Sequence, residues 1–479
     1  MKAEPHSRPG GGSGGRVFSW AGGRDDVLED ERRWNQAMRY QAPRGTADIL
    51  PDEAARWQAV EAAFREACRR FGYGEIRTPI FEQTELFARS VGASTDIVQK
   101  EMYTFTDRGG RSLTLRPEGT APVVRAVIEH RLYGTAELPL KLCYLGPMFR
   151  YERPQSGRQR QFHQFGVEAI GVEAPELDAE VIALGWTFLQ DIGLKGVTLV
   201  LNSLGCPVCR PAYREALVAF LRPHREALCP DCRLRLEQNP LRVLDCKIDG
   251  PTPLVASAPR ITDHLCDACR AHHAAVKAEL DRLGIPYVED PHLVRGLDYY
   301  TRTVFEFVAE GLGAQNTVLA GGRYNGLMAA LGGPDLPGIG FALGAERLLL
   351  LLDEPAEGRV GAPAPDVYVV AFGAGAEKKL SLLMRLRAAG LSADADFAGR
   401  GLKAQLRSAD RRGARYAVIV GDDEARAGRA AIKHLATGAQ WTVAEEELAA
   451  FLAGRIASPN EKEAGDGNDA HVGNHAPNP

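Results

Sequence analysis

The sequence lacks any long apolar run. The longest run of leucine, Leu348–Leu352, falls far short of the roughly 18 residues that a membrane-spanning helix needs, so we expect no span. The opening MKAEPHSRPGGGSGG has no apolar signal core. An excess of basic charge is also missing, because 58 Lys and Arg face 62 Asp and Glu, a net charge of −4. Composition therefore does not predict nucleic-acid binding, and phosphate contacts must come from local patches.

The length and composition predict a globular protein with several domains. The chain has 479 residues, of which 45% are hydrophobic, and this predicts two to four domains with real cores. Nine cysteines without a secretion signal predict reduced thiols in the cytoplasm. Both ends are rich in Gly and charge, so we expect disorder over residues 1–39 and 456–479. Met38 directly precedes the folded pattern, and the sequence leaves open whether translation starts at Met1 or Met38.

A predicted antiparallel hairpin organises the middle of the chain. Two segments with strand character, Lys141–Glu152 and Phe162–Ile170, flank the basic loop Arg153–Gln161. Side chains alternate between the faces of a strand, so the second strand has a polar and an apolar face. The polar face carries Gln164, Gly166 and Glu168, and the apolar face carries Phe165, Val167 and Ala169. Taken alone, the charges near the loop, Arg150 and Glu152, are more commonly solvent-facing charges of a half-solvated sheet than functional residues.

Two motifs precede the hairpin. A helix is predicted from Asp52, ending at Gly72, and a strand follows at Glu75–Ile80. In Thr114–Thr120, TLRPEGT, the proline and glycine mark a turn that presents Glu118 at a strand end. A carboxylate placed there suits a ligand ammonium group, although a surface turn is the simpler interpretation.

Three motifs follow the hairpin. Leu293–Phe307, LVRGLDYYTRTVFEF, has strand character, which places Tyr299 and Tyr300 on opposite faces unless the strand bends. Gly321–Gly326 predicts a Gly-rich turn that lacks the ending of a Walker loop. Gly338–Leu352 predicts a strand, a turn and a helix, with Arg347 in the first helical turn. A cation is disfavoured there by the helix dipole, which favours an anionic ligand.

The cysteines between residues 205 and 284 carry the strongest metal signal. Cys206, Cys209, Cys229 and Cys232 form a C-x2-C, x19, C-x2-C pattern in the spacing range of a tetrahedral zinc site. A third pair, Cys266 and Cys269, and Cys246 lie further along. Structural zinc and reduced thiols in helical hairpins both remain open.

The last third of the chain predicts a small α/β domain. A linker up to Pro365 precedes alternating strands and helices, which imply a mixed sheet between residues 366 and 455. Two basic patches stand out, one at Arg150–Arg160 and one at Arg400–Arg415. A long anionic ligand could touch both patches, although charge runs are usually solvated faces.

These motifs resemble the signatures of class II aminoacyl-tRNA synthetases. The helix and strand ending at Ile80 resemble the first signature, the FRYE string with its loop resembles the second, and GAER at Gly344–Arg347 resembles the third. The class I strings His-x-Gly-His and Lys-Met-Ser-Lys-Ser do not occur. The strings GPMFRYERP, RQFHQFGVE, TLRPEGT and RGLDYY narrow the likeness to the histidyl-tRNA synthetase family, over about Tyr40–Leu452.

The resemblance implies an α+β architecture and a reaction. It implies a class II catalytic core with an antiparallel sheet and flanking helices, a helical insertion, a linker and a C-terminal α/β anticodon-binding domain. The expected boundaries are 40–204 with 285–355, 205–284, 356–365 and 366–455. The implied enzyme is a homodimer that activates L-histidine with ATP and Mg²⁺ and passes it to the 3′-terminal ribose of tRNA(His). Zinc would be structural, since the family's chemistry does not need it.

The resemblance also carries functional residues over to this chain. It implies catalytic roles for Arg150 and Arg295. The implied histidine-binding residues are Glu118, Gly119, Thr120, Gln164, Glu168, Arg295, Tyr299 and Tyr300. The implied ATP-binding residues are Arg150, Glu152 and Arg347. This fits the chemistry, because a carboxylate attacking a phosphate brings two anions together and needs cations rather than a protein nucleophile.

Two alternatives share parts of this pattern. The first is the synthetase-like regulatory subunit of ATP phosphoribosyltransferase in histidine biosynthesis, which is catalytically inactive. That paralogue typically lacks the anticodon-binding domain and degrades the RGLDYY string, and both are intact here. The second, a class II enzyme for another amino acid, conflicts with Gln164, Glu168 and Tyr300 taken together.

Overall fold

The computed structural model describes residues 40–92, 95–310, 316–352 and 364–457. They form two compact units, in which residues 49–59 group with 364–457 and the other described residues form the larger unit. Both predicted disordered ends and most of the predicted linker lie outside the described residues, apart from 456–457, which belong to a helix. No helix in the described part of the chain is long and apolar enough to cross a membrane.

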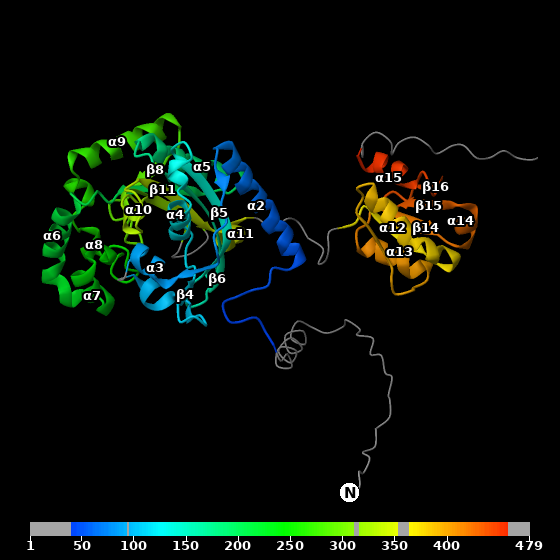
Figure 1. Ribbon diagram of the computed structural model, residues 1–479, viewed down its shortest axis with the longest axis horizontal. Coiled ribbons are helices and arrows are strands. Elements are labelled where there is room, and N and C mark those ends of the chain that lie inside the picture. Colours follow the sequence, from blue (N-terminus) through cyan, green and yellow to red (C-terminus); the bar gives the residue numbers. More distant parts are fainter. Residues whose placement is uncertain (1–39, 93–94, 311–315, 353–363, 458–479) are drawn as a thin grey trace, which may run out of the picture. The chain divides into compact units, whose positions relative to one another are not determined.

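An eight-stranded sheet forms the centre of the larger unit (Figure 1). Its strand order is β1-β5-β6-β11-β10-β9-β7-β8. The outermost pairs, β1 with β5 and β7 with β8, are parallel, and the strands between them are antiparallel. The strands are β1 (Gly74–Glu75), β5 (Leu140–Phe149), β6 (Gln161–Ile170), β7 (Val197–Ser203), β8 (Tyr287–Glu289), β9 (Thr301–Ala309), β10 (Thr317–Arg323) and β11 (Gly338–Gly344).

The predicted hairpin is confirmed as β5 and β6. Its register runs from Leu140 opposite Ile170 to Phe149 opposite Gln161. The strand predicted at Glu75–Ile80 is wrong beyond Glu75, because the chain leaves the sheet after two paired residues. Beyond Glu75, the backbone N–H of Ile76 still donates to the Cys143 carbonyl at 2.8 Å, but the residues that follow are not paired with β5. The chain resumes pairing in a separate three-stranded sheet of order β2-β4-β3, made of β2 (Phe81–Gln83), β3 (Thr104–Thr106) and β4 (Ser112–Leu115).

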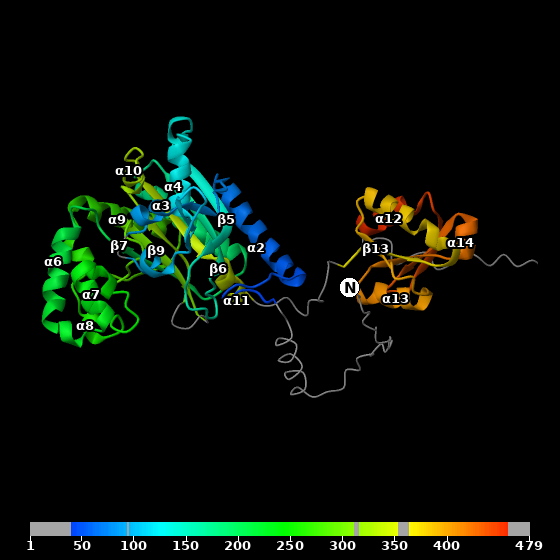
Figure 2. The ribbon, with the colours of Figure 1, turned by 60° about the horizontal axis from the view of Figure 1, so that its bottom comes forward.

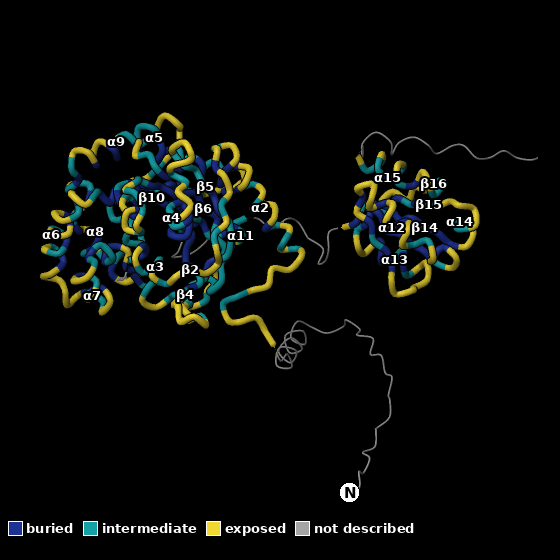
Figure 3. Tube along the Cα trace, viewed as in Figure 1, coloured by how far each residue is buried: buried dark blue, intermediate teal, exposed yellow. Residues whose placement is uncertain are grey.

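The two faces of β6 carry different partners, as its alternation predicts. On the apolar face, Phe165 packs against Phe64 of α2 (Pro51–Arg70), and Phe64 packs against Phe188 of α5 (Pro175–Asp191); both ring-centroid distances are 5.3 Å. On the other face, α4 (Thr120–Glu129) and α10 (Leu327–Ala330) pack with Tyr144. Helices thus cover both faces, and β6 and β10 run through the dark-blue buried layer in Figure 3. The helix predicted from Asp52 is confirmed as α2.

Two short helices and an inserted helical region complete the larger unit. The short helices are α3 (Thr84–Ser90) and α11 (Ala345–Leu351). The helices that follow β7 are α6 (Arg210–Leu221), α7 (Pro230–Gln238), α8 (Pro253–Ala256) and α9 (Asp267–Arg282). Figures 1 and 2 show α6, α7 and α8 grouped beside the sheet. The helical character expected of the insertion is confirmed.

Two local predictions in this unit are wrong. The strand expected from Leu293 begins only at Thr301, so both tyrosines of RGLDYY precede β9. The expected turn at Gly321 is instead the end of β10, which pairs with strands on both sides. A β-carbon on Gly321 would meet the Gly340 carbonyl, and one on Gly322 would meet the Thr303 carbonyl at 2.5 Å. These glycines therefore permit close backbone approach inside the sheet rather than a turn.

The second unit has the predicted mixed sheet. Its strand order is β13-β12-β14-β15-β16, parallel around β12 and antiparallel beyond β14. The strands are β12 (Val367–Ala371), β13 (Ala393–Ala395), β14 (Tyr416–Val420), β15 (Arg429–His434) and β16 (Gln440–Ala444). The helices are α12 (Lys379–Ala388), α13 (Leu402–Arg411), α14 (Asp422–Ala427) and α15 (Leu448–Ala457). The sequence patterns did not predict the elements after β14.

Candidate active site

Two adjoining cavities open above the polar face of the large sheet. The inner cavity, of about 130 Å³, collects the predicted histidine-binding side chains. It is lined by Glu118, Thr120, Arg150, Gln164, Glu168, Arg295, Leu297, Tyr299, Tyr300, Ala320, Tyr324, Gly340, Phe341 and Ala342. The outer cavity, of about 290 Å³, shares Arg150, Gln164 and Arg295 with it. A ligand with two parts can therefore occupy both cavities with its junction at these shared residues.

Small residues make room for the inner cavity. In the sheet register, Glu168 lies opposite Gly340, and Gly340 lies opposite Gly322 on the next strand. A β-carbon on Gly340 would collide with the Glu168 carboxylate. Larger side chains at these positions would fill the space above the sheet. The inner cavity thus exists because small residues face it on neighbouring strands of the sheet.

Glu168 is the buried polar centre of the inner cavity. It is 1% exposed, and Tyr324 donates a hydrogen bond from its hydroxyl to the Glu168 carboxylate at 2.6 Å. Tyr144 contacts the other carboxylate oxygen at 3.5 Å. Burial raises the pKa of Glu168 to about 8, although the hydrogen bonds from Tyr324, Thr120 and Tyr144 oppose that rise. Glu168 therefore holds its proton more tightly than a solvent-exposed glutamate does.

The turn of TLRPEGT places a second carboxylate at the cavity wall. Glu118 accepts hydrogen bonds from the backbone N–H groups of Thr120 at 2.7 Å and Ala121 at 2.9 Å, in the first turn of α4. Burial raises the pKa of Glu118, while these N–H groups oppose the rise. Gly119 does not line the cavity; it leaves space for the Tyr144 ring, which a β-carbon there would strike. Its part in the site is therefore to admit Tyr144.

Tyr299 and Tyr300 line the same cavity rather than opposite faces. Their ring centroids lie 4.7 Å apart, and Tyr299 also packs edge-on against Tyr324 at 6.0 Å. The alternation rule fails here because both residues lie in the irregular segment before β9, where the backbone is not extended.

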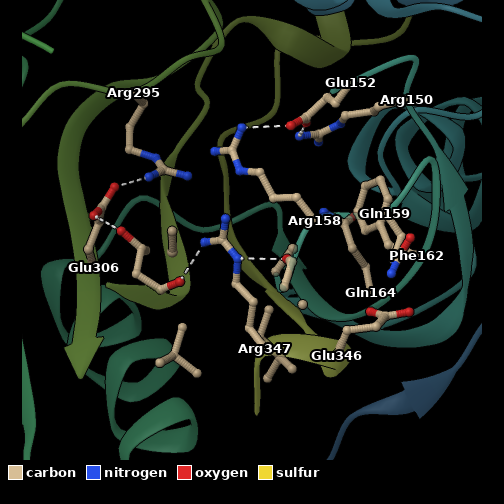
Figure 4. A pocket seen from close by; sticks show the side chains of 17 residues that line it. Arg150, Glu152, Arg158, Gln159, Phe162, Gln164, Arg295, Glu306, Glu346 and Arg347 are labelled. Carbon is tan, nitrogen blue, oxygen red and sulfur yellow. Dashed lines mark hydrogen bonds and ion pairs between the residues drawn. The ribbon is translucent and has the colours of Figure 1, made fainter. Parts of the chain in front are cut away.

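The outer cavity is lined by arginines from separate elements (Figure 4). Arg347 of α11 donates to the carbonyls of Gly157 at 3.1 Å and Thr317 at 2.9 Å. Arg158, from the hairpin loop, donates to Glu152 at 2.6 Å. Burial and the positive charges of Arg158 and Arg150 lower the pKa of Arg347. An anion bound here would relieve this repulsion between like charges.

Arg150 and Arg295 stand at the junction of the two cavities. Arg150 donates to the Pro117 carbonyl at 2.8 Å, and its guanidinium lies 5.2 Å from the centre of the Phe162 ring. Arg295 forms an ion pair with Glu306. Burial alone lowers the pKa of Arg295, but the Glu306 carboxylate outweighs it and raises the pKa overall. Both guanidinium groups are thus held in place before any ligand enters.

Two buried polar atoms at this junction have no hydrogen-bond partner among the described residues. They are the side-chain oxygen of Gln164 and the Nε of Arg295. Buried polar atoms are normally paired, so unpaired ones inside a cavity favour a polar ligand.

Sequence reasoning missed Tyr144, Tyr324 and Glu306 as site residues. Tyr324 was placed in the predicted turn, and Glu306 was not singled out. One signal was available in the alternation of small residues in GIGFALG, where Gly338, Gly340, Ala342 and Gly344 fall on one face. That pattern indicates a hollow over the sheet, into which larger side chains from other elements can reach.

The nine cysteines are free thiols, and seven of them fall into two clusters. Cys206 and Cys209 lie with Cys266 and Cys269, whereas Cys229 and Cys232 lie with Cys246 and Asp249. The single group of Cys206, Cys209, Cys229 and Cys232 read from the spacing is therefore not the group that the fold brings together. Sequence spacing does not report which pairs meet in space.

A mainly antiparallel sheet that places residues of the FRYE and GAER strings around one cavity has the fold and the motifs of the class II aminoacyl-tRNA synthetases. The histidyl-tRNA synthetase family model matches residues 45–208 and 246–348, and an anticodon-binding domain model matches residues 366–455. The chain belongs to the histidyl-tRNA synthetase family.

Individual relatives agree with this assignment. The chain is 57% identical over 425 residues to a histidine–tRNA ligase of Geobacillus kaustophilus, covering 88% of this chain and 99% of the relative. The crystal structure of apo histidyl-tRNA synthetase from S. aureus is similar, with a TM-score of 0.73 and 44% identity over 86% of this chain and all of that chain. A structure described as an ATP phosphoribosyltransferase regulatory subunit/histidyl-tRNA synthetase from Bacillus halodurans C has a TM-score of 0.57 at 23% identity, covering 80% of this chain and 98% of that one. This last likeness concerns the fold alone.

Proposed function

We propose that this chain is a histidine–tRNA ligase. It activates L-histidine with ATP, which gives histidyl-adenylate and pyrophosphate, and then transfers histidine to the 3′-terminal ribose of tRNA(His). The observation that carries the proposal is the junction of the two cavities: a buried cavity centred on Glu168 meets an arginine-lined cavity at Arg150 and Arg295. Identities above 40% to histidine–tRNA ligases support it.

The inner cavity supplies groups for each part of histidine. Glu118 and Thr120 suit the α-ammonium group, and Gln164, whose side-chain oxygen has no partner among the described residues, suits the amino-acid backbone. Glu168 and a tyrosine can pair with the two ring nitrogens of the imidazole. A site of this kind rejects analogues that leave its buried polar groups unpaired, by roughly 10⁴-fold or more.

The outer cavity and the junction suit the reaction with ATP. A carboxylate oxygen of histidine attacks the α-phosphorus, the bond to the bridging oxygen breaks, and pyrophosphate leaves with the electron pair. Arg295 and Arg150, at the junction, face the carboxylate and the α-phosphate, and Arg347 faces the outer phosphates. Removing one preorganised hydrogen-bond donor from a site that stabilises developing negative charge typically costs about 10²- to 10³-fold in rate. No nucleophile of the protein takes part.

The donor set in the outer cavity also fits Mg²⁺. Glu152 and Glu306 are carboxylates on its wall, and Mg²⁺ is usually held by one or two carboxylates together with substrate phosphates. When bound with ATP, Mg²⁺ neutralises phosphate charge. The chain's own residues position the two reactants.

The second unit supplies a surface for tRNA. On α13, Lys403, Arg407 and Arg411 are exposed at intervals of four residues, so they share one helix face. This face lies within the match to the anticodon-binding domain. We expect the hairpin loop Arg153–Gln161 to meet the acceptor end of the tRNA. Binding to both basic regions predicts that tRNA affinity falls steeply between low and physiological salt.

We also propose that the enzyme works as a homodimer in the cytoplasm. The exposed apolar side chains of Ile80, Phe81 and Phe105 support an interface next to the first signature motif. Phe81 and Phe105 stack edge to face at 6.3 Å, and they are 50% and 44% exposed.

The direct test is transfer of labelled histidine to a tRNA(His) transcript. We expect acid-precipitable histidyl-tRNA that requires both ATP and the transcript. Arg295→Gln should lower the rate of transfer about 10³-fold in a protein that circular dichroism shows to be folded. A folded protein that binds histidine but forms no histidyl-tRNA would instead have the function of the regulatory paralogue.

A further inference from the structure

The inserted helices bring two groups of metal-ligand side chains together. In each group, four ligand atoms lie within 4.8 Å of one another. We propose that the chain holds two structural zinc ions: a first centre formed by Cys206, Cys209, Cys266 and Cys269, and a second centre formed by Cys229, Cys232, Cys246 and Asp249.

The sulfur positions in the first centre fit tetrahedral zinc. The Cys206 sulfur lies 3.7 Å from that of Cys209 and 3.9 Å from that of Cys266. Four sulfurs placed tetrahedrally at about 2.3 Å from zinc are about 3.8 Å apart. A disulfide would instead need about 2.05 Å. The spacing matches four thiolates around one zinc ion and excludes a disulfide between these cysteines.

The backbone around the first centre favours thiolates. Cys209 is the N-cap residue of α6 and Cys266 is the N-cap residue of α9. Helix N-termini stabilise negative charge, which includes the charge of a metal-bound thiolate. The Cys266 N–H also donates to the Cys209 sulfur at 3.1 Å. Each C-x2-C pair thus includes the N-cap residue of a helix, Cys209 in the first pair and Cys266 in the second.

The second centre has the same spacing with a carboxylate as its fourth ligand. The sulfurs of Cys229 and Cys246 are 3.8 Å apart, and the Cys232 N–H points at the Cys229 sulfur at 3.4 Å. Asp249 is only 5% exposed, and its carboxylate accepts the Cys229 N–H at 3.0 Å. A buried carboxylate among three thiols is costly unless a cation shares the site. Zinc supplies that cation and accepts a Cys₃Asp ligand set.

The two centres hold different parts of the molecule. The first centre joins the chain just after β7 to the start of α9, which lies 60 residues further on. Its helix α6 carries Arg210, which donates to the carbonyl of Tyr300, a wall residue of the inner cavity. The second centre joins the start of α7 to the turn at Cys246–Asp249. We therefore expect the first centre to position the histidine-binding wall and the second to stabilise the inserted helices.

Neither centre depends on the proposed reaction. Cys229 and Cys232 lie in the stretch 209–245, between the two segments matched by the family model. Ligand identity can thus be tested by metal content and spectroscopy, without measuring activity.

The first experiment measures zinc in the full-length protein, purified under reducing conditions without chelator. We expect two zinc ions per chain, released in two phases by a mercurial thiol reagent. Asp249→Asn keeps the side-chain shape and should lower the content to one. Cys143→Ala, which removes a buried cysteine outside both clusters, should leave two.

The second experiment replaces zinc with cobalt and records the thiolate-to-cobalt charge-transfer absorption. We expect Asp249→Cys to retain two ions and increase this absorption, because a fourth thiolate joins the second centre. Asp249→Asn should decrease it. A wild-type protein with no zinc, with iron in its place, or with one ion would overturn the proposal, and Asp249→Asn with two zinc ions and an unchanged cobalt spectrum would remove Asp249 from the ligand set.

Discussion

The inner and outer cavities share three lining residues, but they differ in the kind of polar group that each presents to a ligand. The inner cavity relies on buried groups that pair with one another, such as Tyr324 with Glu168, and burial raises the pKa of Glu168 to about 8. The outer cavity relies on permanent charge, with Arg347 and Arg158 held by carbonyls and a carboxylate. The inner cavity is therefore suited to discriminate shape and hydrogen bonding, and the outer one to neutralise phosphate charge.

The two cavities should therefore control different properties of the enzyme. Changes in the inner cavity should alter histidine binding and pH dependence, whereas changes in the outer cavity should alter ATP binding. Only substitutions of the residues that line both cavities should alter the binding of both histidine and ATP.

The largest expected effect concerns pH and stability. The folded state binds the Glu168 proton more tightly than the unfolded state, because the pKa is raised from 4.5 to about 8. The contribution of Glu168 to the free energy of unfolding is therefore fully present below pH 4.5 and is lost as the pH rises towards 8. Glutamine does not titrate, so the Glu168→Gln variant does not lose this contribution. Without histidine, the free energy of unfolding of the variant relative to that of the wild type should therefore rise by on the order of 5 kcal/mol between pH 4.5 and pH 8.

Differential scanning fluorimetry across this pH range measures the gain as a growing difference in melting temperature. The difference should level off above pH 8. A difference independent of pH would show that Glu168 titrates at its ordinary value in the empty cavity.

The next largest effect should come from the junction. Arg295→Gln should lower kcat/KM for pyrophosphate exchange about 10³-fold, because one of the cations facing the reacting groups is lost. Exchange kinetics with each substrate varied in turn measure this. Arg69→Gln, on an exposed face of α2 and paired only with Glu66 among the described residues, is the matched control and should change nothing. Equal values of kcat/KM for the two variants would show that Arg295 takes no part in the reaction.

Glu168→Gln should act on histidine alone. A hydrogen bond to a charged group is worth about 1.5–3 kcal/mol, so the KM for histidine should rise between about 10- and 150-fold while the KM for ATP stays within about twofold. Tyr324→Phe, which removes the partner hydroxyl, should give a smaller change in the same direction. A comparable rise in the KM for ATP would show that the inner cavity does not act on histidine binding alone.

The smallest effect is expected at Arg347. Arg347→Lys keeps the positive charge but removes the planar guanidinium, which can donate two parallel hydrogen bonds to a phosphate. The KM for ATP should therefore rise about tenfold. The KM for histidine should not change. Steady-state exchange kinetics measure both values, and a change confined to histidine would contradict the assignment.

Local sequence rules predicted the features that depend on nearby residues. The alternation in β6 correctly separated Phe165 from Gln164 and Glu168, because a strand has a period of two. The turn in TLRPEGT correctly presented Glu118, because proline and glycine fix the backbone there.

Features that depend on distant strands or helices were not predictable in this way. The hollow beneath Glu168 requires Gly340 and Gly322 to meet it in register across three strands. The grouping of Cys206 with Cys266 requires the ends of α6 and α9 to meet. Spacing along the chain suggested Cys229 as the partner instead, because it contains no information about how helices pack.

The central claim is that the inner cavity selects histidine for activation in the outer one. The most direct measurement is exchange of labelled pyrophosphate into ATP, with each of the twenty amino acids in turn. We expect exchange with histidine alone. No exchange with any amino acid, in a folded protein that still binds histidine, would contradict it and make the arginines at the junction ligand-binding residues without a catalytic role.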